Sequence, residues 1–208
     1  MHNNKELYIT RPPTSNMSEY QKKMEEQMRE KQRLRDFKIA MNKFIMTSRF
    51  NNATWAENTQ YRERLNHKGC IYCCPVAVTQ RIPYESIMFV LEMNNDTNQI
   101  IGIGMVKNRA IRDKYKVYAN GNYNRYVFVG KHRIDRVDMN DDEESVMQLF
   151  DRLCFKGNRH MKRGQGLRSF PVELLYELSK KLDLTKFIVE MFKKRMSGKQ
   201  ENKNKNEK

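Results

Sequence analysis

A basic segment late in the chain combines residue types that bind phosphate groups. The stretch LCFKGNRHMKRGQGLRSFP, from Leu153 to Pro171, holds six basic residues and no acidic one. Gly164 and Gly166 flank Gln165, and glycines let backbone N–H groups approach an anion closely. The helix expected after this segment would add a favourable dipole at its N-terminus. The segment therefore predicts an anion-binding loop, in preference to a solvated basic connector.

The loop is not that of a nucleotide-hydrolysing P-loop, because the order Gly-x4-Gly-Lys-Ser/Thr is absent. Its basic side chains and glycine backbone are instead expected to hold the phosphates of a nucleic acid. The residues with this predicted role are Lys156, Arg159, His160, Lys162, Arg163, Gly164, Gln165, Gly166 and Arg168.

A second candidate surface mixes aromatic and basic residues between positions 114 and 133. Aromatic rings interleaved with arginine suit stacking on unpaired bases. Tyr126 and Phe128 are better explained as alternate strand residues in the core, whereas Tyr123 lies in the predicted turn NGNYNRY and is a surface candidate. The residues expected to bind nucleic acid here are Tyr123, Arg125, Lys131 and Arg133.

Trp55 is the only tryptophan in the chain. It either attaches its helix to the core or forms one wall of a base pocket. Both alternatives stay open from sequence, and we include Trp55 among the expected nucleic-acid-binding residues.

Three cysteines and a histidine gather in one short segment. Cys70 and Cys73 have the spacing of zinc ligands, with His67 and Cys74 beside them, but a second distant pair is missing. Along a strand, Cys70, Tyr72 and Cys74 would share one face, and Ile71 and Cys73 the other. Buried free cysteines are common core residues, so we favour a core role and expect neither a metal nor a cofactor.

The sequence contains no recognisable catalytic constellation. Neither a Gly-x-Ser-x-Gly elbow nor a His-Glu-x-x-His motif occurs, and the acidic residues around 135–144 are explained by helix capping. Gly102-Ile103-Gly104 lies inside a strand pattern and lacks the third glycine of a dinucleotide fingerprint. We therefore expect a protein that is not an enzyme.

The overall charge points to a polyanionic partner. The 208 residues carry a formal net charge of +15, with a pI of about 9.7. Nucleic acid is the first expectation and an anionic membrane the second. An apolar run long enough to span a bilayer is absent, and the N-terminus lacks the apolar core of a signal peptide, so we expect an intracellular protein.

The hydrophobic patterning predicts an α+β fold. Residues 1–16 are expected to form an extended arm, because Pro12-Pro13 disfavours a helix. The capping pattern SEYQ predicts a long basic amphipathic helix from Ser18 to about Met46, and TWAE predicts a short one from Thr54 to about Asn66. About five short strands are expected over residues 70–137, with Ile87–Met93 and Gln99–Val106 paired as a hairpin.

Helices are expected again after residue 140. Asn140 is predicted to cap one helix, and Pro171 to lie in the first turn of the next. A further apolar pattern over residues 184–192 predicts a last helix, followed by a disordered lysine-rich tail at 197–208. The chain would thus divide into an arm and long helix at 1–50, an α+β domain at 51–196, and the tail.

The arrangement of a helix, a small barrel and the segment IMFVLEMNNDTNQIIGIGMV resembles the PUA-like superfamily, which includes the EVE, ASCH and YTH domains. The resemblance lies in a strand ending in acid-Met-Asn, a turn into Ile-Ile-Gly-Ile-Gly, and a basic strand after it. It covers roughly residues 54–170. It implies a PUA-like β-barrel, or a curved mixed sheet flanked by helices, that binds RNA or modified bases in a pocket between barrel and helices.

Two segments, GNYNRYVFVGKHRIDR and LCFKGNRHMKRGQGLRSFP, also resemble an uncharacterised protein family of large nucleocytoplasmic DNA viruses. This resemblance implies a viral origin and a location in the host cytoplasm, the nucleus or the virion.

Two functions follow as hypotheses. The first is a non-enzymatic nucleic-acid-binding protein, with RNA a more probable ligand than DNA. The second is a virion-associated structural protein that contacts packaged DNA or other virion proteins, with its N-terminal helix bound to a protein partner.

Overall fold

The computed structural model describes residues 14–111 and 115–206, with side chains described from Glu19 to Ile111 and from Tyr115 to Ser197. The chain divides into two units, Met1–Met41 and Asn42–Lys208. The first contains α1, Thr14–Ala40, a helix with salt bridges such as that between Arg29 and Glu25 on its surface. Because α1 begins before Ser18, the predicted cap at this residue is wrong. Most of the predicted arm lies outside the described residues.

The predicted end of this helix, at about Met46, is also wrong. α1 ends at Ala40, and the following residues form β1, Lys43–Phe50, in the second unit. β1 pairs in parallel with β3, Ile87–Asn94, and its residues from Ile45 to Ser48 are all buried. Burial on both faces of a sheet favours such apolar and β-branched strands, and it outweighs local helix propensity here.

The second unit is built on a mixed sheet of five strands in the order β6-β4-β3-β1-β7. β4 spans Gln99–Lys107, β6 His132–Asp135 and β7 Arg168–Ser169. A second sheet pairs β2, Cys70–Cys74, with β5, Tyr126–Gly130. The five strands predicted over 70–137 and the β3–β4 hairpin are confirmed. The described residues form a curved mixed sheet with a small second sheet, not the closed barrel that was the alternative.

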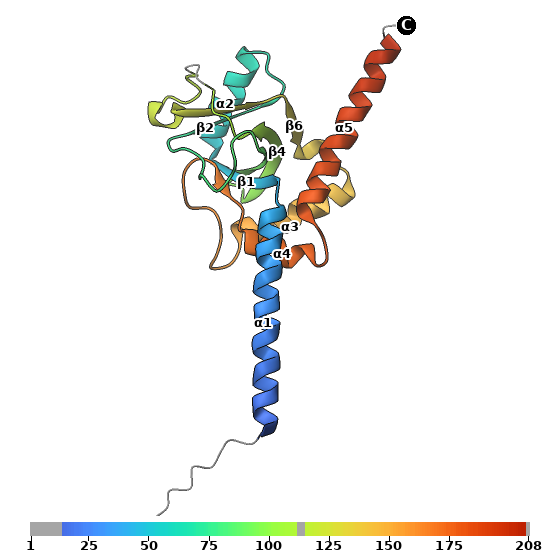
Figure 1. Cartoon of the computed structure of the whole chain (residues 1–208). Coiled ribbons are helices and arrows are strands. Elements are labelled where there is room, and N and C mark those ends of the chain that lie inside the picture. The colour runs from blue at the N-terminus through green and yellow to red at the C-terminus, as the bar shows by residue number, and fades with distance from the viewer. Residues whose placement is uncertain (1–13, 112–114, 207–208) are drawn as a thin grey trace, which may run out of the picture. The chain divides into compact units, whose positions relative to one another are not determined.

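Helices lie on both sides of the large sheet (Figure 1). α2, Asn52–Arg64, contacts β1 and β2. α3, Asp141–Phe155, packs against β4, and α5, Leu184–Asn206, packs against β1 and the neighbouring α4, Val172–Ser179. Two short 3-10 helices, η1 at Gly121–Asn124 and η2 at Arg136–Asp138, flank the β5–β6 segment.

Alternating side chains of β3 separate the two sides of the core. Met88 and Val90 pack with Cys70, Tyr72 and Cys74 of the small sheet. On the other face, the Phe89 ring lies 5.2 Å from that of Phe192 in α5. Because both faces of β3 are covered, its sequence is a nearly continuous apolar run.

The helix caps refine the sequence prediction. Asn140 caps α3 in a capping box with Glu143, as predicted. At α2 the box is instead Asn51 with Thr54, so the helix begins before Thr54. Pro171 immediately precedes α4. The segment predicted as a disordered tail begins inside α5, whose backbone is described as helical to Asn206.

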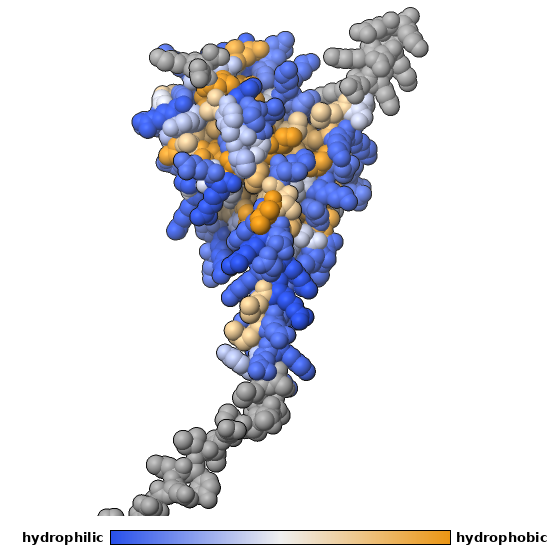
Figure 2. Space-filling view, viewed as in Figure 1, coloured by the Kyte–Doolittle hydropathy of each residue, from blue (hydrophilic) through white to orange (hydrophobic). Residues whose placement is uncertain are grey.

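The face of the molecule in Figure 2 is mainly hydrophilic, with hydrophobic residues scattered in small groups among charged ones. Within the described part of the chain, no helix is both long and apolar enough to cross a membrane.

Candidate functional site

The basic loop between α3 and β7 is held at several points along its length. The Met161 N–H donates to the Cys154 carbonyl at 2.7 Å, and Asn95 Nδ2 donates to the Lys162 carbonyl at 3.1 Å. At its end the Leu167 N–H donates to Cys74 Sγ at 3.3 Å. The loop backbone is therefore fixed against three different elements, while the side chains of Lys156, Arg159, Arg163 and Arg168 are exposed.

The two glycines of the loop adopt backbone conformations that other residues rarely adopt. Gly164 has φ of +112° and Gly166 has φ of +64°. Within the described residues, the backbone N–H groups of Gly164, Gln165 and Gly166 have no hydrogen-bond acceptor. Successive N–H groups of this kind form concave sites for anions.

These glycines line a cavity of about 390 Å³ at the end of β1. The loop forms one wall, the end of β1 and the start of α2 another, and the segment around η1 a third. Residues lining this cavity, which we call the Arg49 cavity, include Arg49, Asn51, Glu57, Cys73, Asn95, Tyr118, Tyr123, Gly164, Gln165 and Gly166. Its volume falls within the range of about 300–1,000 Å³ typical of small-molecule sites.

Arg49 is a candidate site residue that sequence analysis missed. Its Nε donates to the Met161 carbonyl at 2.6 Å, while its Nη1 is buried and has no hydrogen-bond partner. Among the described residues, no carboxylate forms an ion pair with it. Burial and the nearby charge of Arg168 both lower the pKa of Arg49. A half-buried cation without a counter-ion favours an anionic ligand.

Tyrosines and hydrogen-bond acceptors also line the Arg49 cavity. The rings of Tyr118 and Tyr123 meet edge to face, with centroids 6.2 Å apart. Glu57 accepts a hydrogen bond from the Ala119 N–H at 3.0 Å, and Asn95 Oδ1 is buried with no partner. The cavity therefore combines cationic, aromatic and acceptor groups.

The structure brings only part of the predicted surface to this cavity. Tyr123 and the Gly164–Gly166 segment line it, and the loop's basic residues adjoin it in sequence. His160 is half-buried, with its Nδ1 unpartnered. Arg125 is exposed and donates to Asn122 Oδ1 at 3.4 Å.

Arg133, which was predicted to bind nucleic acid, is instead paired with carboxylates inside the fold. Its side chain is 8% exposed and forms an ion pair with Glu92 at 2.8 Å. Asp135 lies 2.6 Å from its other terminal nitrogen. Burial alone would lower the pKa of Arg133, but the two carboxylates raise it. We therefore leave Arg133 out of the binding surface, because its charge is already compensated inside the fold.

Trp55 fits the first of its two alternatives. Its ring packs edge to face on Phe50, with centroids 5.0 Å apart. The guanidinium carbons of Arg62 and Arg133 lie 5.2 and 5.1 Å from its centroid. Trp55 is not among the residues lining the Arg49 cavity. It attaches α2 to the core, and we do not include it in the binding surface.

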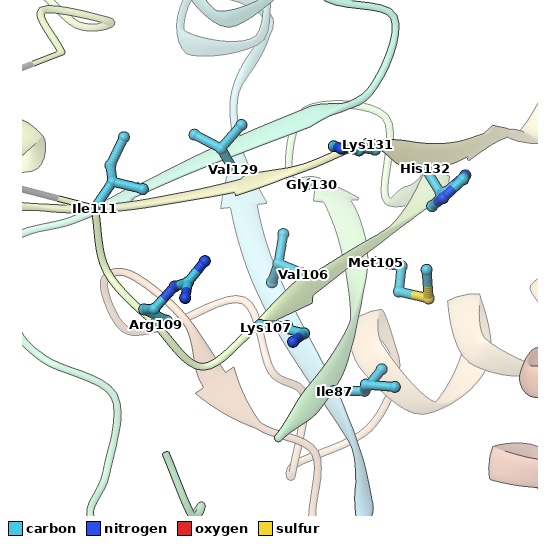
Figure 3. Close-up of a pocket in the computed structure, with 10 residues that line it drawn as sticks. All are labelled: Ile87, Met105, Val106, Lys107, Arg109, Ile111, Val129, Gly130, Lys131 and His132. Atoms are coloured by element: carbon cyan, nitrogen blue, oxygen red, sulfur yellow. The ribbon is translucent and has the colours of Figure 1, made fainter. Parts of the chain in front are cut away.

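Lys131 lines a second cavity, of about 280 Å³, drawn in Figure 3. Ile87, the first residue of β3, lies in this cavity, whereas Phe50, paired with the last residue of β3, lines the Arg49 cavity. The two cavities are thus at opposite ends of the sheet. The lining of the second is mainly aliphatic and basic; its one aromatic ring is the imidazole of His132, and it contains no tyrosine.

The cysteines belong to the core. All four are buried, and burial raises the pKa of Cys70, Cys74 and Cys154 to about 12. Cys70 and Cys74 pack in one cluster and Cys73 in another, as the strand alternation predicted. His67 Nε2 lies 3.0 Å from the Gly130 carbonyl. The part of the chain that is described contains no group of three or more metal-ligating side chains.

We compared the chain with known proteins by family, by sequence and by structure. No protein-family model, curated protein or solved structure matches the chain.

Proposed function

We propose that this protein binds single-stranded nucleic acid without catalysis, and that the Arg49 cavity receives one unstacked nucleotide. The observation that carries the proposal is the guanidinium of Arg49, which has no carboxylate partner among the described residues and lines the same cavity as Tyr123 and the glycine loop. Cations and backbone N–H groups attract phosphate, and tyrosine rings stack on unpaired bases. The second cavity, which Lys131 lines, contains no tyrosine.

The surrounding loop supplies affinity that is independent of sequence. Lys156, Arg159 and Arg163 are exposed on the loop that contributes Gly164 to Gly166 to the cavity, and each phosphate they contact would release condensed counterions. RNA is the first choice of ligand, because recognition of RNA usually targets single strands whose bases are splayed out. The resemblance to the PUA-like superfamily points to the same ligand.

The decisive experiment is a salt titration of binding to a fluorescent single-stranded RNA. Reversal of Arg159, Lys162 and Arg163 to glutamate should weaken binding strongly and make the negative slope of log K against log salt shallower by about 2. A matched control reverses Lys181, Lys186 and Lys194, exposed residues of the α4–α5 region, and so changes net charge equally. If both triple variants bind alike, net charge explains the affinity and the proposed site is wrong.

The alternative, a virion-associated structural role, has its own supporting observation. On α1, Tyr20 and Met28 are each 67% exposed and Met24 is 42% exposed, at four-residue spacing along one face. A partner helix would cover such a stripe. Replacing all three by glutamate should abolish co-purification with a protein partner, whereas a nucleic-acid-binding function should survive the change.

A further inference from the structure

The phosphate end of the Arg49 cavity carries more positive charge than an internal phosphate needs. The guanidinium of Arg49 has no carboxylate partner among the described residues, and Arg168 lies beside the same glycine. A Cβ atom added to Gly164 would lie 3.6 Å from Arg168 Nε and 3.8 Å from Arg49 Cζ. The two cations therefore converge on the loop backbone at Gly164.

Three consecutive backbone N–H groups belong to the loop segment that lines the cavity. Those of Gly164, Gln165 and Gly166 have no acceptor within the described residues. A phosphodiester has one negative charge and two free oxygens. A phosphate monoester has three free oxygens and a charge of about −1.5 to −2 at neutral pH. The donors at this site match the monoester better.

The shape of the site favours the same ligand. Arg49 lines the cavity, and the hydrogen bond from its Nε to the Met161 carbonyl holds the guanidinium in place. An internal phosphate inside a cavity needs two exits for the chain, whereas a terminal phosphate needs one. The tyrosine wall then receives the attached nucleoside, and the volume of about 390 Å³ accommodates one nucleotide.

We propose that the Arg49 cavity binds a terminal nucleotide of a single strand, with its phosphate monoester held by Arg49, Arg168 and the N–H groups of Gly164 to Gly166. This inference rests on the proposed function and makes it specific, because the site would recognise phosphorylated ends. A 5′-phosphate and a 3′-phosphate share this chemistry, and the experiment below distinguishes them.

The test measures binding of the full chain to one short RNA sequence prepared with a 5′-phosphate, with a 3′-phosphate, or with hydroxyl groups at both ends. One of the phosphorylated forms should bind about tenfold tighter than the hydroxyl form, since charge-assisted hydrogen bonds are the strong ones. Arg49→Gln should bring the ratio of the two dissociation constants close to one. Because Arg49 is half-buried, Arg168→Gln provides a second variant at an exposed side chain and should lower the ratio too.

Arg109→Gln, at an exposed arginine of the second cavity, is the matched control and should leave the ratio unchanged. If all three RNAs bind the parent protein equally, the end-recognition inference is overturned while nucleic-acid binding stands. If none binds, both proposals are overturned. A preference that persists in both Arg49→Gln and Arg168→Gln would also overturn the assignment to this cavity.

Discussion

Arg133 and Glu92 form a buried ion pair, in which Nε of the arginine lies 2.9 Å from one carboxylate oxygen and 3.1 Å from the other. The Tyr72 hydroxyl donates to the same carboxylate at 2.7 Å. Gly102 leaves room for this network, since a Cβ atom there would lie 2.7 Å from both Arg133 Nη2 and Glu92 Oε2. The first glycine of the Gly-Ile-Gly motif is thus explained by the space that the buried ion pair needs.

Arg133→Met should therefore destabilise the fold strongly. It leaves Glu92 buried without its cation, and breaking one side of a buried ion pair costs about 3–5 kcal/mol. The free energy of unfolding from urea denaturation measures the effect. The double variant Glu92→Met with Arg133→Met should recover most of the loss, because it removes both charges. A single variant as stable as the parent would contradict the pairing.

Gly166→Ala should destabilise the protein more than Gly157→Ala. Both glycines have positive φ, +64° and +78°, so both substitutions impose a backbone cost of about 1–2 kcal/mol. Only at Gly166 would the new Cβ also press on Cys74, at 3.0 Å from its Cβ. Thermal unfolding compares the two variants. Equal midpoints would show that the packing of the loop against Cys74 contributes nothing.

The pair of Glu143 and Arg195 should make stability depend on pH below neutrality. Two hydrogen bonds from Arg195, 2.7 and 2.6 Å long, lower the pKa of Glu143, against the opposing effect of burial. A carboxyl group whose pKa is lowered by folding stabilises the fold at pH values above its ordinary pKa, about 4.3. This contribution is lost as the pH falls through the pKa of the folded state.

Glu143→Gln should consequently cost about 1.5–3 kcal/mol at pH 7, the range for hydrogen bonds to a charged group. The difference from the parent should shrink as the pH is lowered from 5 toward 3. Urea denaturation at several pH values gives the comparison. A difference that is constant with pH would mean that the carboxylate charge is irrelevant.

The cysteines should resist alkylation in the folded protein. With a pKa of about 12, roughly one Cys70 side chain in ten thousand is a thiolate at pH 8. Cys73 is also buried, and its pKa is raised by burial. Iodoacetamide should therefore modify the cysteines only after denaturant is added, as mass spectrometry would show. Rapid modification of the native protein would contradict the burial.

The parts of the fold that a single local sequence pattern determines were predicted correctly. Asn140 followed by acidic residues specified a cap, and the turn at 94–98 specified the β3–β4 hairpin. The alternation of Cys70 and Cys74 against Cys73 specified the two faces of β2. In each case residues near in sequence determine the geometry, because caps and pleats are local.

The candidate site was only partly predictable, because it depends on contacts between distant segments. Arg49 was missed because the helix predicted to about Met46 left it in a short connection, whereas it lies in β1, which pairs with β3. Arg133 was assigned to the surface, because a sequence does not display its buried partner Glu92. For Arg49, the sequence did offer a signal: the β-branched and aromatic residues of KFIMTSRF, the segment that forms β1, favour a strand.

The position of β1 makes the cavity depend on a contact between segments far apart in the chain. β1 pairs with β3, and its other edge pairs with β7, where Met46 meets Ser169. Closing a loop of more than a hundred residues is entropically costly and slows folding. Gly164 and Gly166 shortly precede β7, so the complete cavity requires this pairing. Recovery of ligand binding should therefore accompany completion of the sheet in refolding experiments.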